Sequence, residues 1–255
     1  DVSESRGLGD VYKRQNRLCV PLPIYVIADQ LGVPRTELTL LKKWSDASVS
    51  RLGRLADEEQ QIQNAKDIVE FQHYFADLID RLRHKPEDNI ISDLANNTID
   101  EGRLLTKPEA LGMIQQILVA GNETSTNAIA GGVVLLIQNP EEQAKLRASA
   151  DLIPSAVEEI LRLETPTSGM WRRATEDTEV GGVAIPEGSF LMVRFAAGNR
   201  DESIFPCGGD MKVDRENANN HMAFGQGTHF CLGAQLARTE LQIAMSSLLR
   251  RTDNW

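Results

Sequence analysis

The chain has 255 residues, with 37 acidic and 27 basic side chains and a formal net charge of −10. This acidic balance argues against nucleic acid as a partner, because phosphate binding requires a basic surface. The three cysteines lie far apart and fit neither a disulfide framework nor a zinc site, and no apolar run has the length that a bilayer requires. We therefore expect a cytoplasmic protein that binds neither nucleic acid nor membranes.

The N-terminal segment, residues 1–16, is polar and lacks a hydrophobic period. We expect it to be a non-native or disordered leader outside the fold. Helical periodicity then dominates as far as residue 163, with Pro and Gly between the apolar segments. The predicted helices span residues 20–31, 36–50, 57–83, 90–96, 107–138, 141–150 and 152–163. The apolar face predicted for the third of them carries Ile62, Ala65, Val69, Ala76, Leu78, Ile79 and Leu82.

The helix predicted over 107–138 contains a polar group at its centre, where residues 120–124 read A-G-N-E-T. An acid and a hydroxyl within an apolar helix need an explanation, because burying them without partners is costly. The Thr124 hydroxyl can bond the carbonyl four residues back. Together with Gly121, that bond would open a notch for a diatomic molecule and a water. The alternative is a surface-facing Glu123 and a satisfied buried Thr124.

Strand signals follow this helical region. The predicted strands cover residues 171–174, 179–185 and 190–195. A turn is expected at 186–188, residues 198–223 are turn-rich, and a last helix is predicted over 232–250. The sequence therefore predicts a mainly α fold with a small β component.

A glycine-rich loop before the last helix carries the strongest chemical signal. It reads FGQGTHFCLG over residues 224–233 and places Cys231 at the N-terminus of that helix. The free backbone N–H groups and the helix dipole favour a thiolate there, and thiolate is a soft metal ligand. The glycines let the backbone approach a flat group, and Phe224 and Phe230 offer it apolar faces. These features indicate a haem iron held by one thiolate, the alternative being a structural cysteine beside a turn.

Two segments together resemble the cytochrome P450 family. The pattern F-G-x-G-x-H-x-C-x-G at 224–233 is similar to the family's haem-binding loop, and A-G-x-E-T at 120–124 is similar to its oxygen-binding groove. The resemblance covers roughly residues 17–251. It implies that residues 17–255 form a partial haem domain of the P450 fold, with a long central helix and with the haem loop before the last helix. One segment, Cys-Gly-Gly at 207–209, stands where the family carries a Pro/Asp-rich turn.

The resemblance implies haem b as cofactor, with Cys231 as the ligand of its iron. The two haem propionates would be bound by His229 and by Arg172, which matches an R-x-x-T strand of the family. Strand alternation favours Arg172 over Arg173, because neighbours point to opposite faces. Further haem contacts would come from the loop and from the long helix: Phe224, Gly225, Gly233, Ala120 and Gly121.

The same resemblance implies roles for residues on both sides of the cofactor. Thr124 would hydrogen-bond dioxygen, and Glu123 would supply protons for cleavage of the O–O bond. Met170 and Trp171 would contact substrate, with packing in the core as the alternative.

A third motif is structural. Glu159 and Arg162 lie three residues apart on one helix face, a spacing that often gives only a surface pair. Here EEILRLETP resembles the family's E-x-x-R helix, which locks onto an arginine before the haem loop. Arg215 holds the matching position, so a network of Glu159, Arg162 and Arg215 is expected to fix the segment ahead of the loop.

We therefore expect a haem-thiolate monooxygenase that inserts one oxygen atom from dioxygen into a small apolar substrate, with electrons from a ferredoxin or flavodoxin. Two alternatives stay open. One is a peroxygenase or an oxygen-independent enzyme on the same scaffold, although the acid–alcohol pair argues against it. The other is a truncated, catalytically incompetent fragment, because family members are longer and the N-terminal portion and extreme C-terminus have no counterpart here.

Overall fold

The computed structural model describes residues 19–53, 57–99 and 102–253. The expected leader, residues 1–16, lies outside the described residues. The chain divides into two compact units, residues 1–126 and 127–255. Helix α6 (Lys107–Gln138) contributes its first part to one unit and its last part to the other. Within the described residues, no helix is long and apolar enough to cross a membrane.

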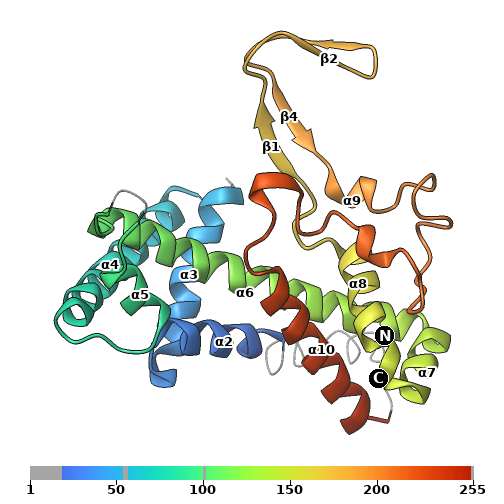
Figure 1. Cartoon of the computed structure of the whole chain (residues 1–255), viewed down its shortest axis with the longest axis horizontal. Coiled ribbons are helices and arrows are strands. Elements are labelled where there is room, and N and C mark those ends of the chain that lie inside the picture. The colour runs from blue at the N-terminus through green and yellow to red at the C-terminus, as the bar shows by residue number, and fades with distance from the viewer. Residues whose placement is uncertain (1–18, 54–56, 100–101, 254–255) are drawn as a thin grey trace. The chain divides into compact units, whose positions relative to one another are not determined.

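The first unit is helical (Figure 1). Its described elements are α2 (Pro21–Leu31), the 3₁₀ turn η2 (Arg35–Glu37), α3 (Leu38–Gly53), α4 (Glu58–His84), α5 (Ile90–Asn96) and the beginning of α6. An aromatic cluster forms the centre of its core. Trp44 of α3 packs against Phe71 and Phe75 of α4, with ring centroids 5.8 Å away in both cases. Each such edge-to-face pair adds about 0.5–1.5 kcal/mol to the stabilisation from burial alone.

Capping side chains explain why the helices begin where the sequence predicts. Asp57 accepts a hydrogen bond at 2.8 Å from the backbone N–H three residues on, at the start of α4. At the start of α6, Thr106 N–H donates to Glu109 at 2.8 Å, and Glu109 N–H donates to the Thr106 hydroxyl at 3.4 Å. This reciprocal capping box satisfies backbone donors that the helix itself leaves free. The helices predicted over 90–96 and 107–138 are confirmed with those boundaries.

The apolar face predicted for α4 is wrong over its first half, where Ile62, Ala65 and Val69 are exposed. The buried stripe instead runs through Asn64, Asp67, Ile68, Phe71, Phe75, Leu78, Ile79 and Leu82. The two phenylalanines decide this stripe, because aromatic rings packed against Trp44 bury more apolar area than Ile62 or Val69 would. Asn64 can enter the stripe because its amide donates to a serine hydroxyl of α3 at 2.9 Å.

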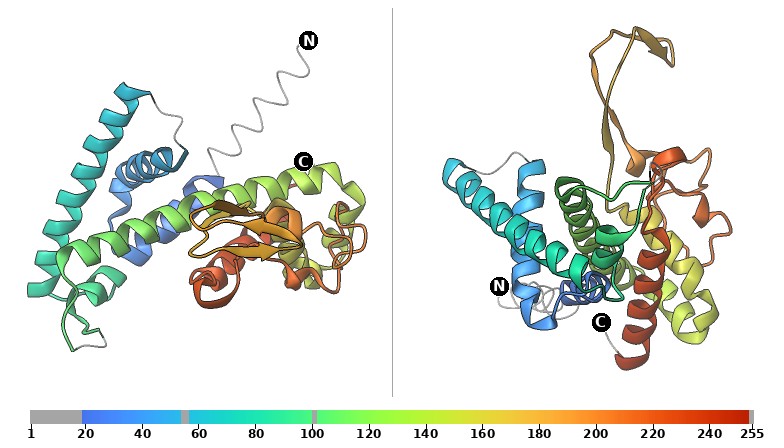
Figure 2. Two further views of the ribbon diagram at one scale, coloured as in Figure 1. Left: turned by 90° about the horizontal axis from the view of Figure 1, so that it is seen from above. Right: turned by 60° about the vertical axis from the view of Figure 1, so that its left-hand side comes forward.

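The second unit joins helices to two small hairpins. Its described elements after α6 are α7 (Pro140–Ala148), η3 (Ala150–Leu152), α8 (Ile153–Glu164), β1 (Met170–Arg173), β2 (Thr178–Val180), β3 (Val183–Ile185), β4 (Phe190–Val193), α9 (Phe195–Gly198), η4 (Ala218–Asn220), η5 (Gly227–His229) and α10 (Ala234–Arg251). Figures 1 and 2 show the strands extending away from the helices of this unit. The mainly α fold with a small β component is confirmed.

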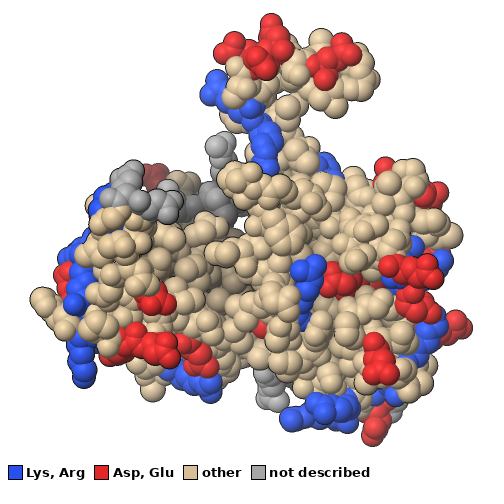
Figure 3. Space-filling view, viewed as in Figure 1, with Lys and Arg blue, Asp and Glu red and all other residues tan. Residues whose placement is uncertain are grey.

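Both hairpins are antiparallel. Strand β1 pairs with β4, so that Met170 lies opposite Val193, and β2 pairs with β3. The single strand predicted over 179–185 is wrong, because Gly181 and Gly182 turn the chain back with φ angles of 59° and 80°. Two consecutive residues with positive φ form the turn that a tight hairpin requires. Figure 3 shows acidic side chains at the outer end of the hairpins and basic ones nearer the helices.

Candidate functional site

The cysteine loop, residues 224–233, leads directly into α10. Two left-handed glycines shape it, Gly225 with φ of 70° and Gly227 with φ of 73°. A side chain added at Gly227 would meet nothing within 4 Å, so glycine is needed there for its backbone conformation. The loop is closed by the Cys231 N–H, which donates to the carbonyl of Phe224 at 2.9 Å. Helix α10 begins at Ala234, three residues after Cys231 and two residues later than the start predicted for this helix.

Cys231 is partly exposed and has apolar neighbours that are more exposed than itself. Phe230 is 47% exposed and Leu232 is 98% exposed. The exposed side chains of Phe230 and Leu232 flank the thiol in the chain, and together they leave apolar surface that is available to an apolar partner. A thiolate is a ligand that haem iron accepts, and the apolar surface beside it suits the flat apolar macrocycle of a haem. The described residues therefore fit a haem at this loop.

The residues expected to bind propionates are exposed. Arg172, in β1, donates to the carbonyl of Trp171 at 2.9 Å, and no described carboxylate pairs with it. Arg173 instead lies over the ring of Phe190, 5.9 Å from its centroid. His229 is exposed at the end of η5. Because both side chains are exposed, Arg172 and His229 are accessible to an anionic group.

The residues expected to contact substrate lie on β1. Met170 is 48% exposed and Trp171 is 64% exposed. Neither side chain packs into the core of the part of the chain that the structure describes. Their apolar surface is available to a further group.

In the first unit, the Thr124 hydroxyl donates to the carbonyl of Ala120 at 2.6 Å. The expected bond to the carbonyl four residues back is therefore present. Helix α6 nevertheless continues without a break, so this bond alone does not interrupt it. A side chain at Gly121 would come within 2.4 Å of the terminal methyl of Ile27, so glycine at this position allows α2 to pack closely on α6.

Glu123 is neither free on the surface nor buried without a partner. Its carboxylate lies 3.7 Å from Lys42 Nζ, and the two side chains are about one third exposed, at 30% and 34%. The adjacent Asn122 is fully buried, and its amide donates to the Ser45 hydroxyl at 3.0 Å. Lys42 and Ser45 were not predicted, because they lie about eighty residues earlier in the chain and carry no motif.

The structure brings Glu159, Arg162 and Arg215 together. Arg162 donates to both oxygens of Glu159 at 2.7 and 2.8 Å, and Arg215 Nε lies 3.0 and 3.1 Å from the same two atoms. All three side chains are buried. The two guanidinium groups also donate to backbone carbonyls of Pro206, Cys207, Gly208, Asp210 and Asn199. One carboxylate thus organises the irregular segment that precedes the cysteine loop.

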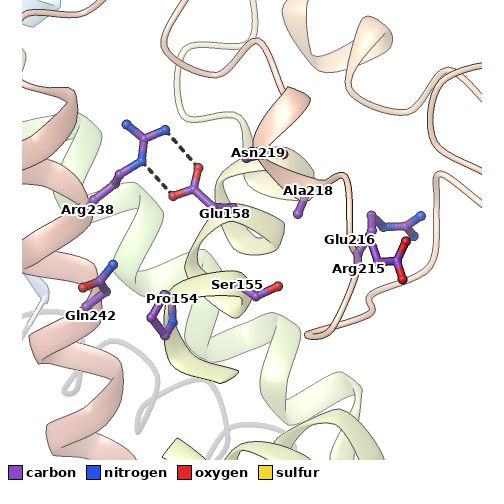
Figure 4. Close-up of a pocket in the computed structure, with 9 residues that line it drawn as sticks. All are labelled: Pro154, Ser155, Glu158, Arg215, Glu216, Ala218, Asn219, Arg238 and Gln242. Atoms are coloured by element: carbon purple, nitrogen blue, oxygen red, sulfur yellow. Dashed lines mark hydrogen bonds and ion pairs between the residues drawn. The ribbon is translucent and has the colours of Figure 1, made fainter. Parts of the chain in front are cut away.

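A second network, which the sequence did not reveal, begins one residue earlier. Glu158 accepts hydrogen bonds from Arg238 at 2.7 and 2.9 Å, and Figure 4 shows this pair bridging α8 and α10. His221 Nε2 lies 3.2 Å from the same carboxylate. Burial by itself raises the pKa of Glu158, but the hydrogen bonds from His221 and Arg238 outweigh it and lower the pKa to about 2. The pair therefore stays charged at neutral pH.

The Glu158–Arg238 pair lies in the wall of a surface pocket of about 400 Å³. The other lining residues are Pro154, Ser155, Arg215, Glu216, Ala218, Asn219 and Gln242. In both the pocket and the network, the contributing residues come from α8, α10 and the segment around η4. These segments, which are far apart in the sequence, therefore meet around Arg238, which contacts Phe224 of the cysteine loop.

Comparison with known proteins identifies a family and a length difference. The model of the cytochrome P450 family matches residues 24–253. Steroid C26-monooxygenase of Mycolicibacterium smegmatis is 39% identical, over 92% of the chain and 58% of that relative. Cytochrome P450 109 of Bacillus spizizenii is 40% identical, over 90% of the chain and 57% of that relative. The chain thus spans under two thirds of the length of these relatives.

Solved structures give the same result. P450BioI in complex with hexadec-9Z-enoic acid ligated acyl carrier protein is 36% identical and superposes with a TM-score of 0.87. That match covers 94% of the chain and 61% of the solved protein. The resemblance inferred from the two sequence motifs is therefore confirmed at the level of family and fold.

Proposed function

The chain belongs to the cytochrome P450 family. From this membership and from the cysteine loop, we propose that it functions as a haem-thiolate monooxygenase. In the overall reaction, one atom of dioxygen enters a C–H bond of an apolar substrate, and two electrons and two protons convert the other atom to water. The observation that carries the proposal is the partly exposed thiol of Cys231 among exposed apolar side chains, three residues before the start of α10. Haem, when bound, supplies the dioxygen-activating chemistry.

We assign residues 17–255 to a partial haem domain in which Cys231 ligates the iron. When haem is bound, the Cys231 thiolate would donate electron density to its iron. Arg172 and His229 bind the two propionates, since both are exposed and Arg172 has no carboxylate partner among the described residues. The remaining haem contacts come from Phe224, Gly225, Gly233, Ala120 and Gly121.

Thr124 and Glu123 handle protons in this proposal. The Thr124 hydroxyl donates to the Ala120 carbonyl at 2.6 Å. Rotation of the side chain about its Cα–Cβ bond would let the hydroxyl donate to a bound ligand instead. The Glu123 carboxylate, partly exposed and paired with Lys42, can take a proton from solvent and pass it on.

The substrate we propose is a small apolar molecule. Met170 and Trp171 expose large apolar surfaces on β1, as an apolar ligand requires. The names of the relatives agree in kind, since one is a steroid monooxygenase and one solved structure holds a fatty acid on an acyl carrier protein. The electron donor we propose is a ferredoxin or flavodoxin.

Isotope labelling tests this reaction. The haem-loaded chain is supplied with a reductase, the electron donor, an apolar substrate and isotopically labelled dioxygen. We expect one labelled oxygen atom in each product molecule, and no product without reductant. Turnover with peroxide but not with dioxygen and reductant, or a product whose new oxygen atom is unlabelled, would contradict the monooxygenase assignment and favour the peroxygenase or oxygen-independent alternative.

A further inference from the structure

Glu158 takes part in no interaction with Glu159, although the two carboxylates are adjacent in α8. Glu159 binds Arg162 and Arg215, whereas Glu158 binds Arg238 and His221. The side chain of Glu158 is only 14% exposed. Withdrawing a carboxylate and a guanidinium from water is costly, and such pairs are often no more stabilising than apolar residues of the same size. A contribution to fold stability alone is therefore a weak explanation for this pair.

His221 holds one orientation toward Glu158. The N–H of Ala223 donates to His221 Nδ1 at 3.1 Å, so Nδ1 acts as an acceptor and carries no hydrogen. In the neutral ring the proton is then on Nε2, which donates to Glu158. The carboxylate thus receives three hydrogen bonds, two from Arg238 and one from His221, and its position relative to α10 is fixed.

Arg238 carries this constraint to the cysteine loop. Its guanidinium lies over the ring of Phe224, 4.7 Å from the centroid, in a cation–π contact. Phe224 begins the loop, and its carbonyl accepts the Cys231 N–H at 2.9 Å. Arg238 itself lies on α10, just beyond the end of the loop. One guanidinium therefore contacts the start of the loop from a position just beyond its end. Glu158 holds this guanidinium through the pair shown in Figure 4.

We propose that Glu158 is a positioning residue for Cys231, acting through Arg238 and Phe224 to fix the cysteine loop on α8. Its relevance to catalysis rests on the proposed function, but the mechanical role does not. Glu158 does not contact Cys231 directly. Its effect on the cysteine passes through Arg238 and Phe224. The left-handed glycines of the loop allow its backbone several conformations. The connection from Glu158 through Arg238 to Phe224, here called the clamp, restricts the loop to one of them.

Hydrogen exchange of the Cys231 amide tests the clamp in the full 255-residue chain. Glu158→Gln keeps the size of the side chain but removes the charge that holds the fork of Arg238. Because hydrogen bonds to charged groups are the stronger ones, we expect exchange at Cys231 to become about tenfold faster or more. Glu216→Gln makes the same chemical change at an exposed acid of the same pocket, and exchange should stay within about twofold.

A second variant shows whether the effect passes through Arg238. Arg238→Lys keeps the positive charge but loses the two-pronged contact, and it should accelerate exchange to a similar degree. The combined Glu158→Gln, Arg238→Lys variant should exchange no faster than the faster single variant, because both changes break one connection. The proposal would be overturned if the two single-variant accelerations multiplied in the double variant. It would also be overturned if exchange at Cys231 were unchanged in folded Glu158→Gln protein.

Folding is followed separately, by helical circular dichroism and by exchange in α4 of the other unit. If Glu158→Gln does not fold, Glu158→Asp keeps the carboxylate on a shorter side chain, and it should raise exchange at Cys231 by an intermediate factor. No change in that variant overturns the proposal. Failure of Cys231 to ligate haem leaves the exchange result intact, so the clamp and the proposed function can fail independently.

Discussion

The guanidinium of Arg162 donates two hydrogen bonds to the carboxylate of Glu159, and solvent reaches neither side chain. A pair so deeply buried has given up all of its hydration, so its stability depends on complete pairing. The pairing is complete here, because Arg215 and the Lys212 N–H share the same carboxylate. The segment before the cysteine loop is therefore only as stable as this network.

Removing one member of the network should be severely destabilising. Arg162→Ala leaves the buried Glu159 carboxylate with only Arg215 and the Lys212 N–H as partners. It also removes the guanidinium donor of the Asn199 and Gly208 carbonyls. We expect the free energy of unfolding of the second unit to fall by about 3–5 kcal/mol, measured by urea denaturation. Arg172→Ala, which removes an exposed arginine, should change it by less than about 0.5 kcal/mol. Equal effects of the two variants would contradict the structural role of the network.

Two adjacent glycines in this segment should respond differently to alanine. A side chain at Gly208 would come within 2.5 Å of the Arg200 carbonyl oxygen, and backbone cannot move aside cheaply, whereas one at Gly209 would meet nothing within 4 Å. Gly208→Ala should therefore cost about 1–3 kcal/mol in thermal or urea unfolding. Gly209→Ala should be within about 0.5 kcal/mol of the parent. A neutral Gly208→Ala would show that the close approach does not exist.

The cysteine loop, the long helix and the order of elements were predicted because local signals carry them. Glycine spacing, Pro and Gly punctuation and helical periodicity act over a few residues. The buried stripe of α4 was predicted wrongly because it is set by the packing of Phe71 and Phe75 against Trp44, which lies in another helix. Lys42 and His221 were missed for the same reason, since their partners are fixed by tertiary packing and no local pattern encodes it.

Acid should release the Glu158 contacts. The pKa of Glu158 is about 2 in the folded chain against an ordinary 4.5, so folding favours its charged form. The stability that it contributes is fully present above about pH 4.5 and is lost as pH falls toward 2. Glu158→Gln has no such contribution to lose. We therefore expect urea denaturation to show a smaller drop in stability between about pH 5 and pH 3, which spans the upper part of this window, in Glu158→Gln than in the parent.

An identical drop in both proteins would mean that the carboxylate keeps its ordinary pKa. Glu216→Gln serves as the control, because it removes an exposed acid of the same pocket. Its pH dependence should follow that of the parent.

Loss of the Thr124 hydroxyl should separate electron consumption from product formation. In Thr124→Ala we expect the yield of product per NAD(P)H oxidised to fall about tenfold or more, because a positioned proton donor contributes about 10²–10⁴-fold to a rate, while reductant is still consumed. Thr126→Ala removes the neighbouring hydroxyl, which donates to the Cys19 carbonyl at 3.1 Å, and should leave that ratio unchanged. If both variants couple as the parent does, Thr124 has no part in proton handling.

The carbon monoxide difference spectrum of the reduced, haem-loaded chain tests the assignment of Cys231 most directly. We predict the long-wavelength band of thiolate-ligated haem in the parent and in Cys207→Ala, which removes another exposed cysteine. In Cys231→Ala that band should be absent, although the protein remains folded by circular dichroism. Retention of the band in folded Cys231→Ala, or its absence from the folded, haem-loaded parent, would contradict the assignment.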